Sequence, residues 1–333
     1  MKITVLGTGG WGTAVVLLLQ RNGHAVTLWS HDKNKAEMLK LKRENPLLKN
    51  VPISEEIYIT DDLNCLKNAE MVVFAAPSFA LREIAHNAAP YIDDGAILVS
   101  LTKGVEQGTH LRMSEIIREE TAGRCPVAVL SGPSHAEEVA ISLPTGCVAA
   151  AEDQSVAETV QKAFMNRSFR VYTHDDVVGV ELAGALKNVA ALCCGICDGA
   201  GLGDNSRALL MTRSLTEMSR LAEKMGGRKE TLAGLAGVGD LIVTCTSMHS
   251  RNHRCGILIG QGKSPKEAVR EIGAVVEGYY AARSAYELAQ EYQVEMPIST
   301  SVYELLYHGA AVVPMIRSLM QRMPRRESDN SWI

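Results

Sequence analysis

The sequence predicts an α/β protein, with a doubly wound and mostly parallel sheet in its N-terminal part and an all-helical C-terminal part. Two observations support this prediction. Short apolar runs alternate with helical stretches through the first half of the chain, which is typical of a parallel sheet covered by helices. From about Asp176, long runs rich in Ala, Leu, Met and Glu replace the strands, for example 206–225 and 264–290.

The elements of the first half follow from local composition. Residues 2–6 are β-branched and apolar and predict a buried strand. Residues 11–21 contain no proline and predict a helix that ends at Gly23. Apolar runs of the same kind as the first predict seven further strands, over 24–29, 57–60, 70–75, 96–100, 127–130, 146–150 and 169–172.

Length and composition set the wider frame. With 333 residues, 46% of them hydrophobic and 22% charged, the chain is long enough for two globular domains. We expect a dinucleotide-binding domain over 1–178, a helical catalytic domain over 179–322 and a polar, mobile tail over 323–333.

A net charge of −4 does not indicate nucleic-acid binding. We expect no membrane span, because no apolar run reaches the length of about 18–20 residues that a spanning helix needs. The apolar N-terminus lacks a signal-peptide cleavage pattern, so we expect a cytoplasmic protein.

The turn between the first strand and the first helix reads GTGGWGTA, with glycines at the spacing G-x-G-x-x-G. The first glycine would allow a tight turn, the second a close approach to a pyrophosphate, and the third the packing of helix on strand. The helix N-terminus offers N–H groups to phosphates. This context predicts a Rossmann-type dinucleotide site, against the alternative of a turn that binds nothing. Its candidate residues are Gly7, Gly9, Gly10, Trp11 and Gly12.

The eight cysteines include a C-x-x-C, Cys194 and Cys197, directly after Cys193. A redox motif is expected where a strand meets a helix, but this one lies in a helical stretch. No second C-x-x-C has zinc-ligand spacing. We therefore expect small buried thiols and no metal site.

Ligands of open α/β sheets bind beyond the carboxyl ends of the strands. The segments at those ends are 76–78, 102–104 and 131–136. Lys103 follows an apolar strand and precedes a glycine, which makes it a candidate site residue. The Gly-Pro-Ser of the third segment could also be only a turn.

Lys187 is unusual in the helical half. Its neighbours on a helix would be Ala183, Gly184, Ala190 and Ala191, which are small and uncharged. Small neighbours leave room for a ligand, and partial desolvation disfavours the charged ammonium and so promotes proton transfer. The alternative is a surface lysine beside a helix that packs on the alanines.

Two further segments carry polar residues before helical stretches. Asp240 follows the glycines of AGVG and opens an apolar run. Ser250 can cap a helix, and Arg251 and Asn252 would then lie in its first turn, where an anion is favoured. A capped helix with a solvent-facing arginine explains the local sequence equally well.

Taken together, these segments resemble the bacterial NAD(P)-dependent glycerol-3-phosphate dehydrogenases. The resemblance covers residues 2 to about 320, in the family's order. The matching segments are GTGGWGTA, VTLWSHD, SLTKGVE, LSGPSHAEEV, ELAGALKNVAAL, AGVGDLIVTCTS, SRNHRCG and VVEGYYAA.

The resemblance implies a reversible hydride transfer between NAD(P)H and dihydroxyacetone phosphate, giving sn-glycerol 3-phosphate for phospholipid synthesis. It implies that Lys187 is the general acid and base. Lys103 and Asp240 would contact substrate, Asp240 would also contact Lys187, and a homodimer is expected. Further substrate contacts are implied for Gly132, Ser134, Ser250, Arg251 and Asn252. Cofactor contacts are implied for Lys103, Ala136, Arg251, Val275 and Glu277.

Two other functions compete. In the β-hydroxyacid dehydrogenase group an Asn lies four residues after the catalytic lysine, whereas here that position is Ala191 and Asn188 is adjacent. A non-catalytic, redox-sensing nucleotide-binding protein would need the glycine turn but not Lys187. Both comparisons favour a glycerol-3-phosphate dehydrogenase.

The end of the second strand bears on cofactor choice. An acid there typically binds the ribose 2′-hydroxyl of NAD, but the strand ends at Trp29 and is followed by Ser30, His31 and Asp32. Ser30 and His31 can donate to a 2′-phosphate, and Asp32 is well placed to cap the next helix. We therefore expect use of both cofactors with NADPH favoured, and His31 beside the 2′-phosphate.

Overall fold

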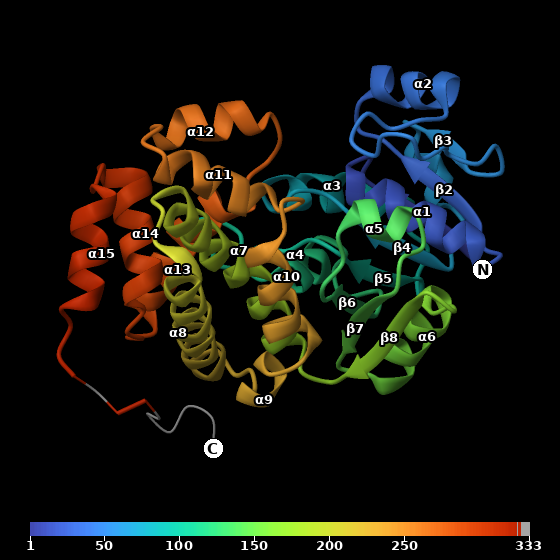
Figure 1. Cartoon of the computed structure of the whole chain (residues 1–333). Helices are drawn as coiled ribbons and strands as arrows, with labels where there is room; N and C mark the ends of the chain where they lie inside the picture. Colours follow the sequence, from blue (N-terminus) through green and yellow to red (C-terminus); the bar gives the residue numbers. More distant parts are fainter. Residues whose placement is uncertain (325, 328–333) are drawn as a thin grey trace. The chain divides into compact units, whose positions relative to one another are not determined.

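The computed structural model describes residues 1–324 and 326–327, and the chain divides into two compact units (Figure 1). The sheet unit comprises Met1–Lys103 and Leu111–Val177. The helical unit comprises Gly104–His110 and Val178–Ile333. Most of the tail expected over 323–333 lies outside the described residues.

The sheet unit contains one eight-stranded sheet in the order β3-β2-β1-β4-β5-β6-β7-β8. Its strands are β1 (Lys2–Leu6), β2 (Ala25–Trp29), β3 (Tyr58–Thr60), β4 (Met71–Phe74), β5 (Ile97–Ser100), β6 (Val127–Ser131), β7 (Thr145–Ala151) and β8 (Phe169–His174). All neighbouring strands are parallel except β6 and β7. The predicted fold class is confirmed. The strand order reverses between β1 and β4, which is where such sheets bind ligands.

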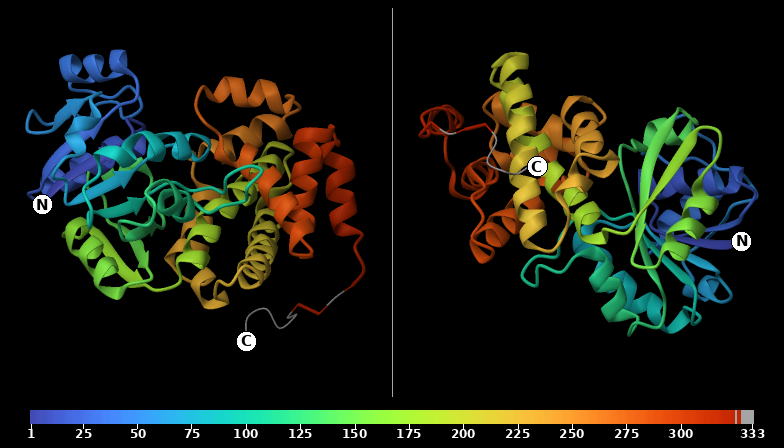
Figure 2. Two further views of the ribbon diagram at one scale, coloured as in Figure 1. Left: turned by 180° about the vertical axis from the view of Figure 1, so that it is seen from behind. Right: turned by 90° about the horizontal axis from the view of Figure 1, so that it is seen from below.

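Two layers of helices cover the two faces of this sheet, as Figure 1 and Figure 2 show from opposite sides. The helices are α1 (Gly10–Arg21), α2 (Lys33–Lys42), α3 (Leu81–Ala88), α4 (Met113–Glu120), α5 (Ala136–Ala140) and α6 (Gln154–Phe164). Three short 3₁₀ turns lie at Leu63–Leu66, Ser78–Ala80 and Ala89–Tyr91.

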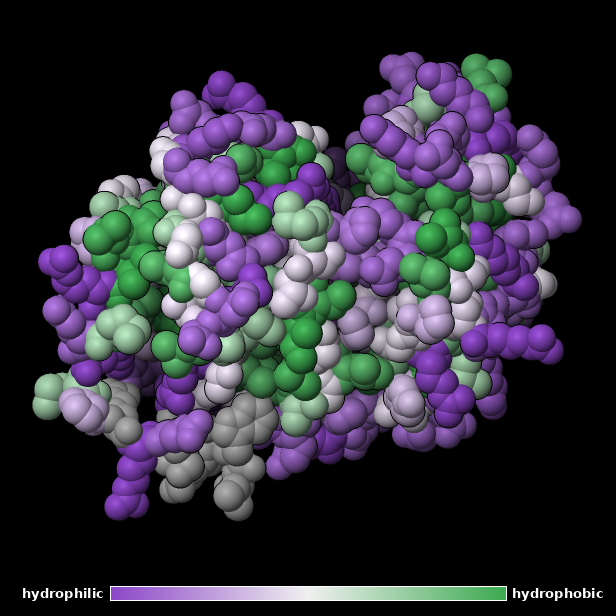
Figure 3. All heavy atoms as spheres, in the orientation of Figure 1, coloured by the Kyte–Doolittle hydropathy of each residue, from purple (hydrophilic) through white to green (hydrophobic). Residues whose placement is uncertain are grey.

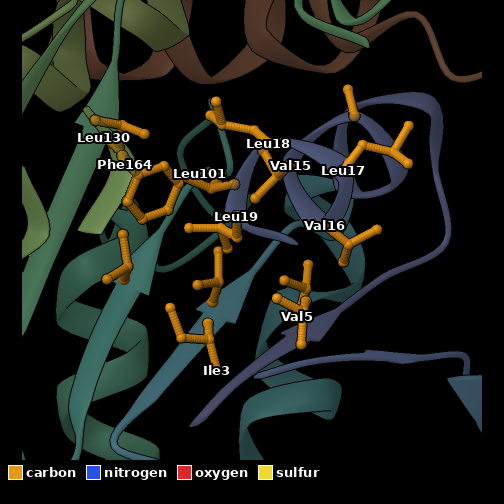
Figure 4. Packing of buried hydrophobic residues seen from close by; sticks show 14 of the residues in the cluster. Ile3, Val5, Val15, Val16, Leu17, Leu18, Leu19, Leu101, Leu130 and Phe164 are labelled. Carbon is orange, nitrogen blue, oxygen red and sulfur yellow. The ribbon is translucent and has the colours of Figure 1, made fainter. Parts of the chain in front are cut away.

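Alternation along the strands builds a separate core on each face. Ile3 and Val5 of β1 pack with α1, α5 and α6 (Figure 4), whereas Leu6 packs with α3 and α4. The carboxyl ends of the strands are thereby held rigidly for a site.

The helical unit is built around one central helix, α7. Its helices are α7 (Val177–Gly199), α8 (Gly203–Lys224), α9 (Lys229–Leu232), α10 (Asp240–Thr246), α11 (Arg251–Gly260), α12 (Pro265–Ile272), α13 (Glu277–Glu291), α14 (Pro297–His308) and α15 (Val312–Met320). A π-helical turn, Leu235–Gly239, precedes α10. Nearly every side chain of α7 from Leu182 to Ile196 is buried, which is typical of a helix surrounded on all sides.

The expectation that no segment is long and apolar enough for a membrane span needs correction. α7 has 23 residues, and an 18-residue window within it has a mean hydropathy of 1.6, so it passes that test by length and composition. However, 94% of its most apolar window is buried inside the protein. Its apolar character is therefore that of a core helix.

The helix-forming run over 264–290 comprises two helices. α12 ends at Gly273, whose φ of 66° is left-handed, and α13 begins only at Glu277. Glycine is the residue that most readily adopts this conformation at a helix end. The break places residues 274–276 in a connecting segment.

The eight cysteines are thiols that form no disulfide within the described residues, and seven of them are buried. Cys193, Cys194 and Cys197 lie on α7, and burial raises the pKa of the Cys197 thiol to about 11. This agrees with the expected inert thiols. Within residues 1–324 and 326–327, no three His, Cys, Asp or Glu side chains are grouped to hold a metal ion.

Candidate active site

The glycine turn between β1 and α1 needs two of its three glycines for steric reasons within the protein. Gly7 has a φ of 128°, and a Cβ there would lie 2.5 Å from the carbonyl oxygen of Ala75. A Cβ on Gly12 would lie 2.0 Å from the carbonyl oxygen of Gly7, so α1 could not approach β1. Around Gly9, in contrast, a Cβ would meet no heavy atom within 4 Å.

The open side at Gly9 coincides with the N-terminus of α1. No side chain caps this helix, and its first turn has no acidic residue. Its N–H groups and the positive end of its dipole are thus suited to an anion. An open glycine beside an uncapped helix N-terminus fits the pyrophosphate of a dinucleotide, which Gly9, Gly10, Trp11 and Gly12 would hold.

The turn is held in place by contacts that the sequence did not reveal. Asn45 is fully buried, and its side-chain amide donates to the Thr8 carbonyl at 3.1 Å and to Thr13 Oγ1 at 2.6 Å. The residue lies more than 30 positions from the turn, and no motif singles it out. A Cβ added to Gly10 would lie 3.7 Å from Cβ of Ala136, at the start of α5.

At the end of β2, Asp32 caps α2. Its Oδ1 accepts from the N–H groups of Asn34 at 2.8 Å and Lys35 at 3.2 Å, as predicted. The expectation that Ser30 donates to a phosphate is wrong for this conformation. Ser30 is fully buried, and its hydroxyl is engaged with Thr8 Oγ1 and the Asp32 N–H, each at 3.3 Å. His31 is exposed.

Three further candidates meet at the carboxyl ends of β5 and β6. Lys103 Nζ donates to the Gly132 carbonyl at 3.0 Å, and Ser134 Oγ donates to the same oxygen at 2.9 Å. Gly132 has a φ of 144°, and a Cβ there would lie 2.9 Å from Cα of Cys147. Only glycine allows this backbone path, so the predicted residues come together through a steric requirement.

Directly after Lys103, the segment Gly104–His110 belongs to the helical unit. His110 Nδ1 lies 2.9 Å from Glu291 Oε2, and its Nε2 lies 3.0 Å from Glu287 Oε2. Only a protonated imidazole donates from both nitrogens. Burial lowers the pKa of His110, but hydrogen bonds to the two carboxylates outweigh it, and the pKa is raised above its ordinary value of 6.5.

This histidine gives a testable pH dependence. Because its pKa is raised on folding, its contribution to the free energy of unfolding is complete below about pH 6.5 and is lost as the pH rises through the higher, folded value. Both carboxylates are partly exposed, so the contribution should be about 0.2–1 kcal/mol. Urea unfolding should show a larger loss for His110→Gln at about pH 6 than at about pH 9.

The matched control is His308→Gln, which removes an exposed imidazole whose Nε2 lies 3.2 Å from the Tyr303 hydroxyl. It should show no such pH dependence. An equal loss for His110→Gln at both pH values would contradict the assignment.

In the helical unit, Lys187 is not the unpartnered cation that its sequence neighbours suggest. Lys187 and Asp240 are only 5% and 1% exposed, and Lys187 Nζ lies 2.7 Å from Asp240 Oδ1. The ammonium also donates to Thr244 Oγ1 at 2.6 Å. The Thr244 hydroxyl in turn lies 2.6 Å from the Asp240 carbonyl. Thr244 was missed, although it lies one helical turn after Asp240.

The position of Asp240 depends on the turn before it. A Cβ on Gly237 would lie 2.0 Å from the Leu232 carbonyl oxygen, so glycine is required where the π-helical turn meets α9. α10 then begins at Asp240, where a carboxylate is favoured by the helix dipole. The turn therefore fixes the position of Asp240 independently of its contact with Lys187.

A polar chain links the next residue of α7 to two other predicted segments. Asn252 donates to Asn188 Oδ1 at 2.9 Å and accepts from the Gly278 N–H at 2.8 Å. Ser250 caps α11, its hydroxyl accepting from the His253 N–H at 3.2 Å. Asn252 thereby connects α7, α11 and the start of α13.

The remaining predicted residues of this unit flank that chain. Arg251 is exposed in the first turn of α11, while Val275 and Glu277 are partly buried around the start of α13. In this unit Asp240 and the segment from Ser250 to Asn252 lie at helix N-termini, and their side chains contact Lys187 and Asn188 in the middle of α7. A buried ammonium with an anionic partner and an adjacent exposed guanidinium can transfer a proton and bind an anion.

Comparison with known proteins covers both parts of the chain. Residues 2–157 match the model of the NAD-dependent glycerol-3-phosphate dehydrogenase N-terminus, and residues 176–317 match that of its C-terminus. The chain is 51% identical to a glycerol-3-phosphate dehydrogenase (NAD(P)+) of Thermoanaerobacter sp. (strain X514), over 98% of this chain and 99% of that protein. A protein of the same name from Fusobacterium nucleatum is 48% identical over the full length of both.

Solved structures give the same result. The crystal structure of glycerol-3-phosphate dehydrogenase from Coxiella burnetii superposes with a TM-score of 0.93 at 39% identity, covering 96% of this chain and 99% of that one. Sequence and structure agree along the whole chain, and this protein belongs to the NAD-dependent glycerol-3-phosphate dehydrogenase family.

Proposed function

We propose that the protein catalyses the reversible reduction of dihydroxyacetone phosphate to sn-glycerol 3-phosphate with NAD(P)H, in the cytoplasm and as a homodimer, for phospholipid precursor synthesis. The observation that carries the proposal is the buried Lys187 ammonium, oriented by Asp240 and Thr244. A buried charge of this kind is expensive unless it is paired, and its donors suit a ketone oxygen.

In the direction of reduction, Lys187 donates a proton to the ketone oxygen of the substrate. Asp240 holds the ammonium in place and balances its charge. In the reverse direction the neutral amine accepts the proton of the hydroxyl, and Asp240 stabilises the ammonium that forms. The reduced nicotinamide, when bound, supplies the hydride to the carbonyl carbon.

The other residues bind and orient. Gly9, Gly10, Trp11 and Gly12 hold the pyrophosphate, as the open helix N-terminus supports. The remaining cofactor contacts are assigned to Ala136, Val275 and Glu277. The substrate contacts are assigned to Lys103, Gly132, Ser134, Ser250, Arg251 and Asn252, of which Lys103 and Arg251 also reach the cofactor.

An absorbance assay tests this function. Purified protein should oxidise NADPH or NADH at the nicotinamide band when dihydroxyacetone phosphate is added. A β-hydroxyacid dehydrogenase would instead oxidise a 3-hydroxy acid in the reverse assay with NAD(P)+. A non-catalytic nucleotide sensor would bind the cofactor and turn over neither substrate.

Arg251→Ala is expected to weaken substrate binding rather than the chemical step. Loss of one charge-assisted hydrogen bond costs about 1.5–3 kcal/mol, or roughly ten- to a hundredfold in affinity. The variant should lose most of the preference for dihydroxyacetone phosphate over unphosphorylated dihydroxyacetone. Steady-state kinetics with both substrates measures this preference.

Arg270→Ala is the matched control, since Arg270 is exposed on the neighbouring helix α12 and its loss removes the same charge. It should leave the ratio unchanged. A wild-type ratio for Arg251→Ala would mean that the phosphate is bound elsewhere.

NADPH is expected to be used at least as well as NADH. The Asp32 carboxylate caps α2 and is engaged by its backbone N–H groups. His31 is exposed, and Lys33 and Lys35 follow it in the first turn of that helix. Cations at this point favour a 2′-phosphate. The measurement is the ratio of kcat/KM for the two cofactors, and His31→Ala should lower it toward NADH.

A tenfold or greater preference for NADH would contradict this assignment and give the ribose to Asp32. In that case Asp32→Ala should erase the preference, beyond the loss of about 1 kcal/mol expected for a missing helix cap. Asp153→Ala is a matched control, because Asp153 caps α6 in the same way.

A further inference from the structure

The helical unit contains a cavity of about 730 Å³ that none of the proposed reaction residues lines. It is bounded by α8, α14, α15 and the C-terminal half of α7. Most of its wall is apolar, and the main contributors are Leu209, Leu210, Met315, Ile316, Leu319 and Met320. Its volume lies within the range of about 300–1,000 Å³ that is typical of small-molecule sites.

The wall of this cavity includes one partly buried cation that has no partner among the described residues, and the exposed Arg326 and Glu327 also line it. Arg213 on α8 is partly buried, and among the described residues its guanidinium has no hydrogen-bond or ion-pair partner. Two other arginines at the cavity are engaged with Glu295: Arg220 donates to its carbonyl at 3.4 Å, and Arg322 pairs with its carboxylate. Arg213 is therefore set apart from its neighbours.

The carboxylate deepest in the wall does not neutralise Arg213. Glu217 is 3% exposed, and it accepts from the backbone N–H groups of Ile298 at 2.7 Å and Ser299 at 3.1 Å. It therefore anchors the start of α14. The apolar cavity is left with a guanidinium whose charge requires an anion.

We propose that this cavity binds a long-chain fatty acid, with its carboxylate on Arg213 and its alkyl chain against α8 and α15. A guanidinium binds carboxylate through two parallel hydrogen bonds. The apolar wall would remove the chain from water. Three methionines, Met315, Met320 and Met323, line the cavity, and their flexible side chains can adapt to an alkyl chain.

The surface around α15 supports this choice. Met320 and Met323 are 68% and 81% exposed, and Figure 3 shows apolar side chains gathered over α14 and α15. An alkyl chain would cover part of this apolar surface. Charge complementarity with a single partly buried cation selects an anionic amphiphile over a neutral one, and the site is independent of the function proposed above.

Calorimetric titration of the full chain with octanoate, decanoate and dodecanoate, each below its micelle concentration, tests the proposal. Each two-carbon extension should tighten binding by roughly tenfold, because every buried methylene adds to the free energy of transfer. Decanoate should bind more tightly than 1-decanol, which has the same chain and no charge.

Variants separate the two ends of the ligand. Arg213→Gln should weaken decanoate by roughly ten- to a hundredfold and leave 1-decanol unchanged. Leu319→Gln should weaken both ligands. Arg317→Gln is the control, since Arg317 is exposed on α15, does not line the cavity and carries the same charge. Thermal unfolding establishes that each variant is folded.

Three results would overturn the proposal. The first is no dodecanoate binding at about 1 mM, the weak end of measurable affinity. The second is equal decanoate affinity for the wild type and Arg213→Gln. The third is binding that appears only after residues 328–333 are deleted or the protein is diluted, which would mean that the chain's own end or a second copy occupies the cavity.

Discussion

Replacing Lys187 with alanine is expected to lower kcat by roughly 10²–10⁴-fold, the usual contribution of a positioned general acid. The ammonium lies 2.7 Å from Asp240 Oδ1 and 2.6 Å from Thr244 Oγ1. These two hydrogen bonds fix the orientation of the ammonium group. No second ammonium can take its place from the same face of the helix, because the helical neighbours of Lys187 are alanine and glycine. The KM for the cofactor should change little.

The same substitution should also destabilise the protein, which the sequence alone did not suggest. On the sequence alone, the small and uncharged helical neighbours of Lys187 predict that its replacement by alanine leaves folding nearly intact. The structure shows instead that Asp240 is 1% exposed, and removing one partner of a buried ion pair costs about 3–5 kcal/mol. The alanine variant therefore mixes a chemical effect with a folding effect.

Lys187→Arg separates the two effects. A guanidinium keeps the positive charge beside Asp240 but does not give up its proton at accessible pH. The arginine variant should recover much of the free energy of unfolding and little of the turnover. Lys224→Ala, at an exposed position near the end of α8, controls for the loss of one lysine.

Urea unfolding and initial rates, measured on the same preparations, test both claims. A folded Lys187→Arg or Lys187→Ala variant that keeps more than a tenth of the wild-type kcat would rule out Lys187 as the general acid.

The features predicted from the sequence are those that local patterns determine. The parallel sheet follows from apolar strands that alternate with helices, and the steric roles of Gly7 and Gly12 follow from their spacing. Asp32 and Ser250 are capping residues whose position before a helix reveals their role. In each case the chemistry depends on residues within one turn or one strand.

The features that could not be predicted depend on contacts between distant segments. Asn45 supports a turn that lies more than 30 residues away. Thr244 contacts Lys187 only because α10 packs beside α7, and Ser30 is withdrawn from the cofactor side by Thr8. None of these pairs has a local signature, since they arise from tertiary packing.

The C-x-x-C of α7 shows how a familiar pattern can have another cause. Gly195, the first of the two residues between the cysteines, lies where α7 meets α11. A Cβ there would be 2.1 Å from the His253 carbonyl oxygen. Gly199 follows one turn later, and Gly256 and Gly260 face them from α11. A Cβ added to any of these glycines would lie within 2.3 Å of a carbonyl oxygen of the other helix. The four glycines allow two backbones to touch.

Gly256→Ala is therefore expected to damage both folding and turnover. The added methyl group would lie 2.2 Å from the Leu192 carbonyl oxygen and 2.8 Å from Cα of Gly195. A backbone oxygen cannot turn away as a side chain can, so α7 and α11 must separate. Overpacking usually costs about 1–3 kcal/mol, and this clash should reach the upper end of that range.

The same separation would displace the N-terminus of α11, the proposed substrate-binding end, from Lys187 of α7, the proposed general acid. Ser250, Arg251 and Asn252 lie at the N-terminus of α11, and Asn252 reaches Asn188 of α7 through a 2.9 Å hydrogen bond. A displacement of about 1 Å can lower turnover by roughly 10²-fold.

Gly234→Ala is the matched control, because Gly234 has a φ of −89° and a Cβ there would lie 3.3 Å from the Thr231 carbonyl oxygen. Urea midpoints and kcat should fall together for Gly256→Ala and stay near wild type for Gly234→Ala. A Gly256→Ala protein with wild-type values of both would show that the contact between the two helices does not position the site.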